Sequence, residues 1–163
     1  MLLTASLDNR AGFGKIASRI GLSADAHIFD RDSDLLAQVL AAHKVLPLAC
    51  LLVDEAQFLA PEQVWQLSAL ADDHNLPVMC YGLRTDFQGK LFPGSAELLA
   101  IADVLREIRT ICHCGRKATM VIRQSSDGTI LTDGVQIEIG GNEKYVSLCR
   151  KHWKDATGNA QTK

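Results

Sequence analysis

The sequence has no long hydrophobic run and no signal-type leader. Its longest uninterrupted apolar stretches, such as Leu48–Val53, are far shorter than the roughly 20 residues that a helix needs to cross a bilayer. Met1 is followed by no basic segment and no secretory core. We therefore expect a cytoplasmic protein without a membrane partner.

The sequence also lacks a strong excess of charge of either sign. With 17 basic and 19 acidic residues its net charge is −2, so we expect no nucleic-acid partner. The charge is uneven, because residues 1–105 carry 7 basic and 13 acidic groups and residues 106–163 carry 10 basic and 6 acidic groups. This change of sign near residue 106 indicates a boundary between two parts of the chain.

The composition shows none of the biases of collagen, disordered or coiled-coil chains. Hydrophobic residues make up 47% of the 163 positions. A globular chain of this length buries roughly 70% of its unfolded surface, which suffices for one core and a small additional module.

Residues 1–105 alternate short apolar runs with helical patterns, which predicts an α/β fold with a mostly parallel sheet. The runs predict strands, and apolar positions three or four apart predict helices. The predicted strands are Leu2–Ala5, Ala26–Phe29, Ala49–Val53 and Pro77–Tyr81, and the predicted helices are Asp32–His43, one that begins at Pro61, and Ser95–Ile101.

Residues 106–163 show a different sequence pattern, in which short strand-like runs are separated by turn signals. Ala118–Arg123 and Val135–Ile139 are predicted strands, and Ser125–Gly128 is a predicted turn. We expect a small antiparallel hairpin module, separate from residues 1–105.

The five cysteines are an odd number, and their spacing argues against a disulfide framework. Cys50 and Cys80 lie inside apolar runs and are expected to be buried core residues. The other three cysteines have the spacing of metal ligands.

The strongest spacing pattern pairs a C-x-C, Cys112 and Cys114, with a C-x-x-H, Cys149 and His152. A hairpin between the pairs can bring the four side chains around a tetrahedral ion, for which zinc is the natural occupant. Four protein ligands leave no position for water, so the site would be structural. His113 is the rival ligand, and chance proximity of the thiols is the alternative without a metal. We favour His152, because it supplies a second partner to Cys149.

A second pattern is the apolar strand that ends in Asp54 and Glu55. In open α/β sheets, ligands bind outside the carboxyl ends of the strands. An acidic residue at that place holds Mg²⁺ in nucleotide-phosphate enzymes, and a second carboxylate can act as a base. Apolar strands often end in Asp, so the pattern alone does not distinguish a site from an ordinary strand end.

The loop from Tyr81 to Phe92 follows the next predicted strand. Its aromatic residues could stack on a planar ring, and Arg84 could face phosphate. From composition alone, the simpler interpretation is that Phe87 and Phe92 fasten the loop to the core.

A phosphate-binding loop is not present at Gly12–Lys15, although these residues look like the end of one. The template G-x-x-x-x-G-K-[ST] requires Gly where Asn9 stands and a hydroxyl where Ile16 stands. No G-x-G-x-x-G segment fits a strand-to-helix turn either.

Four segments, in order, resemble the zinc-containing (type II) thymidine kinases. They are Asp54–Phe58, Tyr81–Phe87, Cys112–Ala118, and Ile139–Tyr145 with Cys149 and His152. The resemblance runs from about Leu3 to His152. It implies transfer of the γ-phosphate of ATP to the 5′-hydroxyl of deoxythymidine, with Mg²⁺. It also implies a P-loop-type α/β core, a C-terminal zinc-bearing lasso domain and a homotetramer.

The resemblance also implies roles for individual residues. Glu55 matches the general base, and Asp54 matches the acidic residue that assists Mg²⁺. The other matched positions are Ala56 and Gln57 in the nucleotide-contacting segment, Asp8 and Arg10 near phosphate, Phe58, Phe87 and Phe92 as aromatic walls of the nucleoside pocket, Ile139, Gly140, Gly141 and Tyr145 in the lasso, and Cys112, Cys114, Cys149 and His152 as zinc ligands. This reverses the simpler interpretation of Phe87 and Phe92.

The chain departs from the family pattern at its start. Family members begin with a strand and a glycine-rich loop ending in Gly-Lys-Ser/Thr, and neither stands before Leu3. We expect an N-terminally truncated core, from a start assigned too late or from a fragment, with a degenerate relative as the third alternative. We also expect little or no kinase activity from this chain alone. The alternative function is a non-catalytic zinc-ribbon module that binds nucleic acid or a protein.

Overall fold

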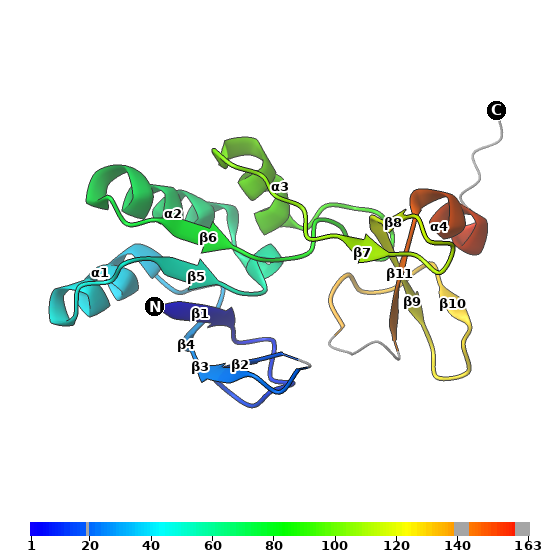
Figure 1. Ribbon diagram of the computed structural model, residues 1–163, viewed down its shortest axis with the longest axis horizontal. Helices are drawn as coiled ribbons and strands as arrows, with labels where there is room; N and C mark the ends of the chain where they lie inside the picture. Colours follow the sequence, from blue (N-terminus) through cyan, green and yellow to red (C-terminus); the bar gives the residue numbers. More distant parts are fainter. Residues whose placement is uncertain (19, 139–143, 159–163) are drawn as a thin grey trace. The chain divides into compact units, whose positions relative to one another are not determined.

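The fold is described from a computed structural model, for residues 1–18, 20–138 and 144–158 (Figure 1). The chain forms two compact units. The first unit comprises Met1–Arg84 and Phe92–Ala102, and the second comprises Thr85–Leu91 and Asp103–Lys163. The loop Thr85–Leu91 therefore groups with the C-terminal part of the chain.

A four-stranded sheet with the order β4-β1-β5-β6 forms the centre of the first unit. All of its pairs are parallel. Its strands are β1 Leu2–Ala5, β4 His27–Phe29, β5 Leu51–Val53 and β6 Val78–Cys80. The predicted α/β class with a parallel sheet is confirmed, and each predicted strand of this part overlaps an observed one.

Three α-helices complete the first unit: α1 Leu35–Val45, α2 Pro61–His74 and α3 Pro93–Ile101. Helix α1 begins later than expected, because Asp34 caps it by accepting the N–H of Ala37 at 2.9 Å. Pro61 is the first residue of α2, as predicted. A short 3₁₀ helix, η1 Ala56–Phe58, follows β5.

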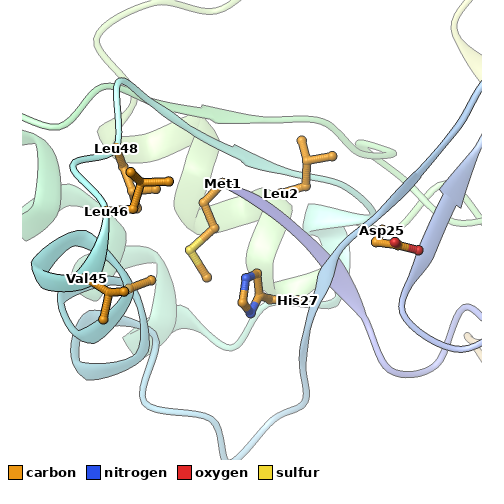
Figure 2. Close-up of a pocket in the computed structure, with 8 residues that line it drawn as sticks. Met1, Leu2, Asp25, His27, Val45, Leu46 and Leu48 are labelled. Atoms are coloured by element: carbon orange, nitrogen blue, oxygen red, sulfur yellow. The ribbon is translucent and has the colours of Figure 1, made fainter.

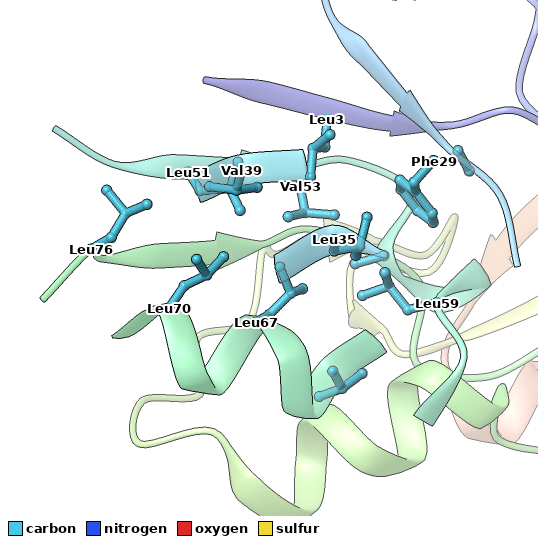
Figure 3. Close-up of a cluster of buried hydrophobic side chains, with 13 residues drawn as sticks. Leu3, Phe29, Leu35, Val39, Leu51, Val53, Leu59, Leu67, Leu70 and Leu76 are labelled. Atoms are coloured by element: carbon cyan, nitrogen blue, oxygen red, sulfur yellow. The ribbon is translucent and has the colours of Figure 1, made fainter. Parts of the chain in front are cut away.

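The core of the first unit lies between the sheet and helices α1 and α2 (Figure 3). Leu3, Leu51 and Val53 on the strands are fully buried. Their helix partners include Val39 on α1 and Leu70 on α2. This packing fixes the strand ends that carry the polar residues described below.

A small hairpin interrupts the first unit between β1 and β4. Its strands are β2 Lys15–Ala17 and β3 Ser23–Asp25, which pair antiparallel. The sequence pattern does not predict this hairpin, because the segment is short and largely exposed. Lys15 begins a strand and not a helix, which agrees with the rejection of a phosphate-binding loop there.

An open, mostly apolar depression lies at the amino-terminal end of the sheet (Figure 2). It is lined by Met1, Leu2, Asp25, His27, Ala42, Val45, Leu46 and Leu48. Ligands of parallel α/β sheets bind at the opposite, carboxyl-terminal end. We therefore do not place the functional site in this depression.

The second unit is built on a three-stranded antiparallel sheet with the order β10-β9-β11. Its strands are β9 Met120–Gln124, β10 Ile130–Leu131 and β11 Tyr145–Leu148. A smaller pair, β7 Thr110–Ile111 with β8 Lys117–Ala118, and helix α4 Arg150–Thr157 complete it. Its small core contains Cys112, Ala118, Ile122, Leu148, Cys149 and Trp153.

The predicted strand Val135–Ile139 is wrong over its described part, residues 135–138. Strand β9 pairs instead with β10 and β11. The carbonyls of Asp133 and Val135 accept N–H groups from the side chain of Arg123, so this segment takes its partners from a guanidinium and not from a strand. None of the helices within the described ranges is long and apolar enough to span a membrane.

Candidate functional site

Asp54 and Glu55 follow β5 directly, at the carboxyl end of the central sheet. The N–H of Asp54 still donates to the carbonyl of Leu3 at 2.8 Å. Glu55 then adopts a left-handed conformation, with φ 53° and ψ 37°, before η1 begins. Left-handed backbone is unfavourable for a residue other than Gly, Asn or Asp, and such strain concentrates at functional sites. The turn directs the Glu55 carboxylate away from the line of the strand.

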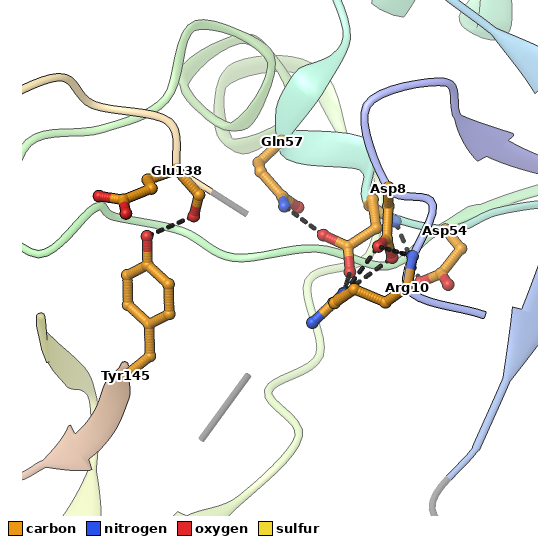
Figure 4. Close-up of polar contacts among 7 residues, drawn as sticks. Asp8, Arg10, Asp54, Gln57, Glu138 and Tyr145 are labelled. Carbon is orange, nitrogen blue, oxygen red and sulfur yellow. Dashed lines mark hydrogen bonds and ion pairs between the residues drawn. The ribbon is translucent and has the colours of Figure 1, made fainter. Parts of the chain in front are cut away.

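The Glu55 carboxylate is held from two sides, by Arg10 and Gln57, which are labelled in Figure 4. Its Oε1 accepts a hydrogen bond from Nη2 of Arg10 at 2.6 Å, and its Oε2 accepts one from Nε2 of Gln57 at 2.6 Å. Arg10 in turn donates from Nε and Nη2 to the two carboxylate oxygens of Asp8, each at 2.7 Å. Residues from the end of β1 and the end of β5 therefore form one connected polar group.

The three carboxylates at this place, Asp8, Asp54 and Glu55, differ in their electrostatic environment. Burial raises the pKa of the Glu55 carboxyl, and the hydrogen bond from Gln57 and the charge of Arg10 offset part of that rise. Burial also raises the pKa of Asp54. The hydrogen bond from Arg10 lowers the pKa of Asp8. Arg10 thus favours the ionised form of Asp8, while Glu55 is a carboxylate better suited to accept a proton.

Gln57 is buried and connects this group to the chain after β6. Its Oε1 accepts the N–H of Leu83 at 3.0 Å, while its Nε2 donates to Glu55. The chain at Gly82 passes so close that an added Cβ would lie 2.6 Å from Oε1 of Gln57. The N–H of the neighbouring Ala56 donates to the carbonyl of Tyr81 at 2.8 Å. These contacts fix the orientation of the Gln57 amide.

The predicted aromatic residues lie in both units. In the first unit, the rings of Phe58 and Phe92 meet edge to face, with centroids 6.1 Å apart. In the second unit, Phe87 is buried, and the guanidinium of Arg123 lies over its ring at 3.9 Å. Tyr145 donates its hydroxyl to the carbonyl of Glu138 at 2.6 Å. The predicted residues Ile139, Gly140 and Gly141 lie outside the described residues.

Cys112, Cys114, Cys149 and His152 come together in the second unit, with their ligand atoms all within 4.8 Å of one another. Cys112 and Cys114 lie on the turn between β7 and β8, and Cys149 and His152 lie at the start of α4. Burial opposes ionisation of Cys112, but N–H groups of Cys114 and Cys149 and the ring of His152 outweigh it and lower its pKa to about 5. An ionised thiolate is the form that binds metal.

The spacing within this cluster matches a tetrahedral ion. Around zinc, two sulfur ligands lie about 3.8 Å apart, and a sulfur and a nitrogen about 3.5 Å apart. The sulfurs of Cys114 and Cys149 are 3.9 Å apart, and Nδ1 of His152 lies 3.4 Å from the sulfur of Cys112 and 3.6 Å from that of Cys149. These four residues therefore fit zinc. The rival His113 is not a member of the cluster, and its ring stacks on His152 with centroids 4.3 Å apart.

Sequence reasoning missed two buried polar side chains of the second unit. Arg123 lies on β9 within a run that reads as an ordinary strand, and nothing in its spacing distinguishes it from a surface arginine. Trp153 follows His152 and donates from Nε1 to the carbonyls of Phe87, at 3.1 Å, and Val121, at 3.0 Å. The amphipathic helical pattern of residues 150–157 is the signal that could have predicted helix α4 and its one buried residue, Trp153.

The chain matches known proteins over almost its whole length. A family model described as thymidine kinase matches residues 1–153. A protein of Ruegeria pomeroyi named "Thymidine kinase" is 62% identical over 162 residues, which are 99% of this chain and 82% of the relative. A protein of the same name from Agrobacterium fabrum is 65% identical over 94% of this chain and 79% of its own length. Another, from Vibrio cholerae, is 54% identical over 97% of this chain and 82% of its own length. The chain belongs to the thymidine kinase family, whose members are phosphate-transferring enzymes.

Proposed function

We propose that this protein transfers the γ-phosphate of ATP to the 5′-hydroxyl of deoxythymidine, forming dTMP as a precursor of DNA. The observation that carries the proposal is the position of Glu55, at the carboxyl end of β5 and held at both oxygens by Arg10 and Gln57. A fixed carboxylate of raised pKa is suited to accept the proton of a hydroxyl nucleophile. The family assignment supplies the substrate class.

In the proposed reaction, Glu55 takes the proton of the 5′-hydroxyl while the 5′-oxygen of deoxythymidine attacks the γ-phosphorus. The bond between this phosphorus and the bridging oxygen breaks, and ADP leaves with that electron pair. Magnesium bound with ATP would neutralise charge on the phosphates, and Asp54 is the side chain proposed to assist it. Asp8 keeps Arg10 in place beside Glu55, where a guanidinium can face a phosphate.

We propose, from the resemblance, that Phe58, Phe87 and Phe92 are aromatic walls of the nucleoside pocket and that Tyr145 is the tyrosine of the lasso. Ile139, Gly140 and Gly141 would contribute main-chain groups that read the edge of thymine. A main-chain grip of this kind disfavours bases that leave its polar groups unpaired.

We propose that the Cys112, Cys114, Cys149 and His152 cluster holds one structural zinc ion. The support is the fit of its spacing to a tetrahedral site and its four protein ligands. Among the described residues, the buried cluster of the second unit has six members, two of which are proposed ligands, so a metal would supply much of its stability. We further propose residues 1–105 as the kinase core, residues 106–163 as the lasso domain, and a cytoplasmic homotetramer; these rest on sequence and resemblance.

Two measurements test the proposal. Isothermal titration of deoxythymidine into this chain tests the nucleoside pocket, with deoxyguanosine as the control ligand. Phosphoryl transfer from ATP is then measured in the chain extended ahead of Met1 by a family strand and glycine-rich loop. We expect saturable deoxythymidine binding and formation of dTMP. If a folded, zinc-containing protein neither binds deoxythymidine nor forms dTMP, the proposed function is refuted.

A further inference from the structure

Arg123 is almost completely buried, with 3% of its side chain exposed, although it lies on a short strand in a small unit. Its Nη1 donates to the carbonyl of Val135 at 2.9 Å, and its Nη2 donates to that of Asp133 at 3.4 Å. Nη1 also lies 3.3 Å from a carboxylate oxygen of Glu138. One guanidinium thus binds three points along the irregular segment 133–138.

The same guanidinium packs on the loop Thr85–Leu91. Its central carbon lies 3.9 Å from the centroid of the Phe87 ring. The chain at Gly134 also approaches so closely that an added Cβ would lie 2.6 Å from Nη2 of Arg123. Arg123 is therefore in close contact with both an aromatic face and a glycine backbone, contacts that suit the planar guanidinium better than a lysine ammonium.

A second connection joins these two segments without Arg123. Nε2 of Gln136 donates to Oδ2 of Asp86 at 2.8 Å. The other oxygen of Asp86 accepts the N–H groups of Gln88, at 2.9 Å, and Lys90, at 2.8 Å. Asp86 therefore closes its own loop and holds segment 133–138 against it.

Glu138 is the point at which this arrangement reaches the lasso. Besides Arg123, its carboxylate contacts Nζ of Lys144 at 2.6 Å, and its carbonyl accepts the hydroxyl of Tyr145 at 2.6 Å. Residues 138 and 144 flank the lasso residues 139–143 in the sequence. The contacts of Glu138 with Lys144 and Tyr145 thus join the residues on either side of that stretch.

Burying the Arg123 guanidinium in a small core carries a desolvation cost. Within the described part of the chain, Nε of Arg123 has no hydrogen-bond partner. A buried, incompletely paired cation is often no more stabilising than an apolar residue of similar size. Stability alone therefore does not account for the residue, whereas holding two loops in one arrangement does.

We propose that Arg123 is a positioning residue for deoxythymidine binding. It holds Phe87 and residues 133–138 in a single arrangement, and Glu138 in turn bonds to Tyr145, so that Phe87 and Tyr145 are preformed for nucleoside binding. Without it, that arrangement would have to be ordered when the nucleoside binds, which weakens affinity. The inference rests on the proposed function, because it assumes that Phe87 and Tyr145 bind the nucleoside.

The test compares Arg123→Met and Arg123→Lys with Arg109→Met, which removes an exposed arginine of the same unit. Deoxythymidine affinity is measured by isothermal titration, and hydrogen exchange is followed in peptides covering residues 132–138. Zinc content reports whether the unit is folded. We expect both Arg123 variants to bind deoxythymidine about tenfold or more weakly, and to exchange residues 132–138 faster, with unchanged zinc content. The Arg109 variant should match the parent.

Binding within about twofold of the parent for Arg123→Met, or full rescue by lysine, would overturn the proposal. If Arg123→Met loses its zinc, Gln136→Leu decides, because it removes the bonds from Gln136 to Asp86 and Leu91 and keeps Arg123: weaker deoxythymidine binding supports the proposal, and unchanged binding contradicts it. If the parent chain itself binds no deoxythymidine, the proposed function fails. Unchanged exchange of residues 132–138 in the Arg123 variants would then refute the positioning role separately.

Discussion

Nη2 of Arg10 lies 2.6 Å from Oε1 of Glu55, so the proposed catalytic base is ion-paired in the resting protein. The same guanidinium is held by Asp8. The protonation of Glu55 therefore depends on two opposing effects: burial raises the pKa of its carboxyl, and the charge of Arg10 lowers it. Arg10 is therefore expected to control the pH range in which Glu55 can act as a base.

Arg10→Gln should raise the pKa of Glu55 further. The substitution removes the positive charge that favours the carboxylate and leaves the burial that opposes it. The ionised fraction of Glu55 then falls at a given pH, so the acid limb of the activity profile moves to higher pH. A carbon-13 titration of the Glu55 carboxyl measures the pKa directly, with the exposed Arg31→Gln as the control. A lower or unchanged pKa in Arg10→Gln would show that the ion pair is not formed in solution.

The metal cluster predicts about one zinc ion per chain. Cys112→Ser should lower the zinc content and unfold the second unit, because the metal replaces much of a core there. Cys80→Ser is the matched control, since Cys80 lies in the first unit and burial raises its pKa to about 11. Metal analysis and thermal unfolding provide the measurements. Equal zinc content in the two variants would count against the cluster as a metal site.

Trp153→Phe should destabilise the second unit by about 1–3 kcal/mol. The indole N–H serves the carbonyls of Phe87 and Val121, and phenylalanine would leave both without this donor. The control is Trp65→Phe, whose indole N–H contacts Glu97 at the surface of the first unit and should cost about 0.5 kcal/mol or less. Urea unfolding, followed by circular dichroism, compares the two. A similar midpoint for both variants would mean that the buried hydrogen bonds of Trp153 are not important.

Sequence patterns predicted those parts of the fold in which local chemistry and tertiary structure agree. The apolar run before Asp54 became a buried strand, and Pro61 began a helix, because each residue type is suited to only one such environment. The C-x-C and C-x-x-H spacing also identified a group of four side chains that the fold brings together. The assignment of roles to Glu55 and to the aromatic residues stays a prediction.

The missed features depend on contacts between segments far apart in the chain. Residues 135–138 have the composition of a strand, but the carbonyl of Val135 accepts from the side chain of Arg123 and that of Glu138 from the hydroxyl of Tyr145. A pattern rule treats arginine as a surface residue, so it cannot anticipate a buried guanidinium that replaces a neighbouring strand. The left-handed turn at Glu55 is likewise invisible in a Val-Asp-Glu sequence, because it is set by the hydrogen bond from Ala56 to Tyr81.

The most direct test of the account is Glu55→Gln, with the exposed Glu62→Gln as its control. Turnover is measured with ATP, Mg²⁺ and deoxythymidine in the chain extended by a glycine-rich loop, and deoxythymidine affinity is measured by titration. If Glu55 is the base, Glu55→Gln should lower kcat by about 10²–10⁴-fold and leave deoxythymidine binding nearly unchanged, because the amide keeps the shape but cannot accept the proton. A kcat equal to that of the parent and of Glu62→Gln would contradict the central claim.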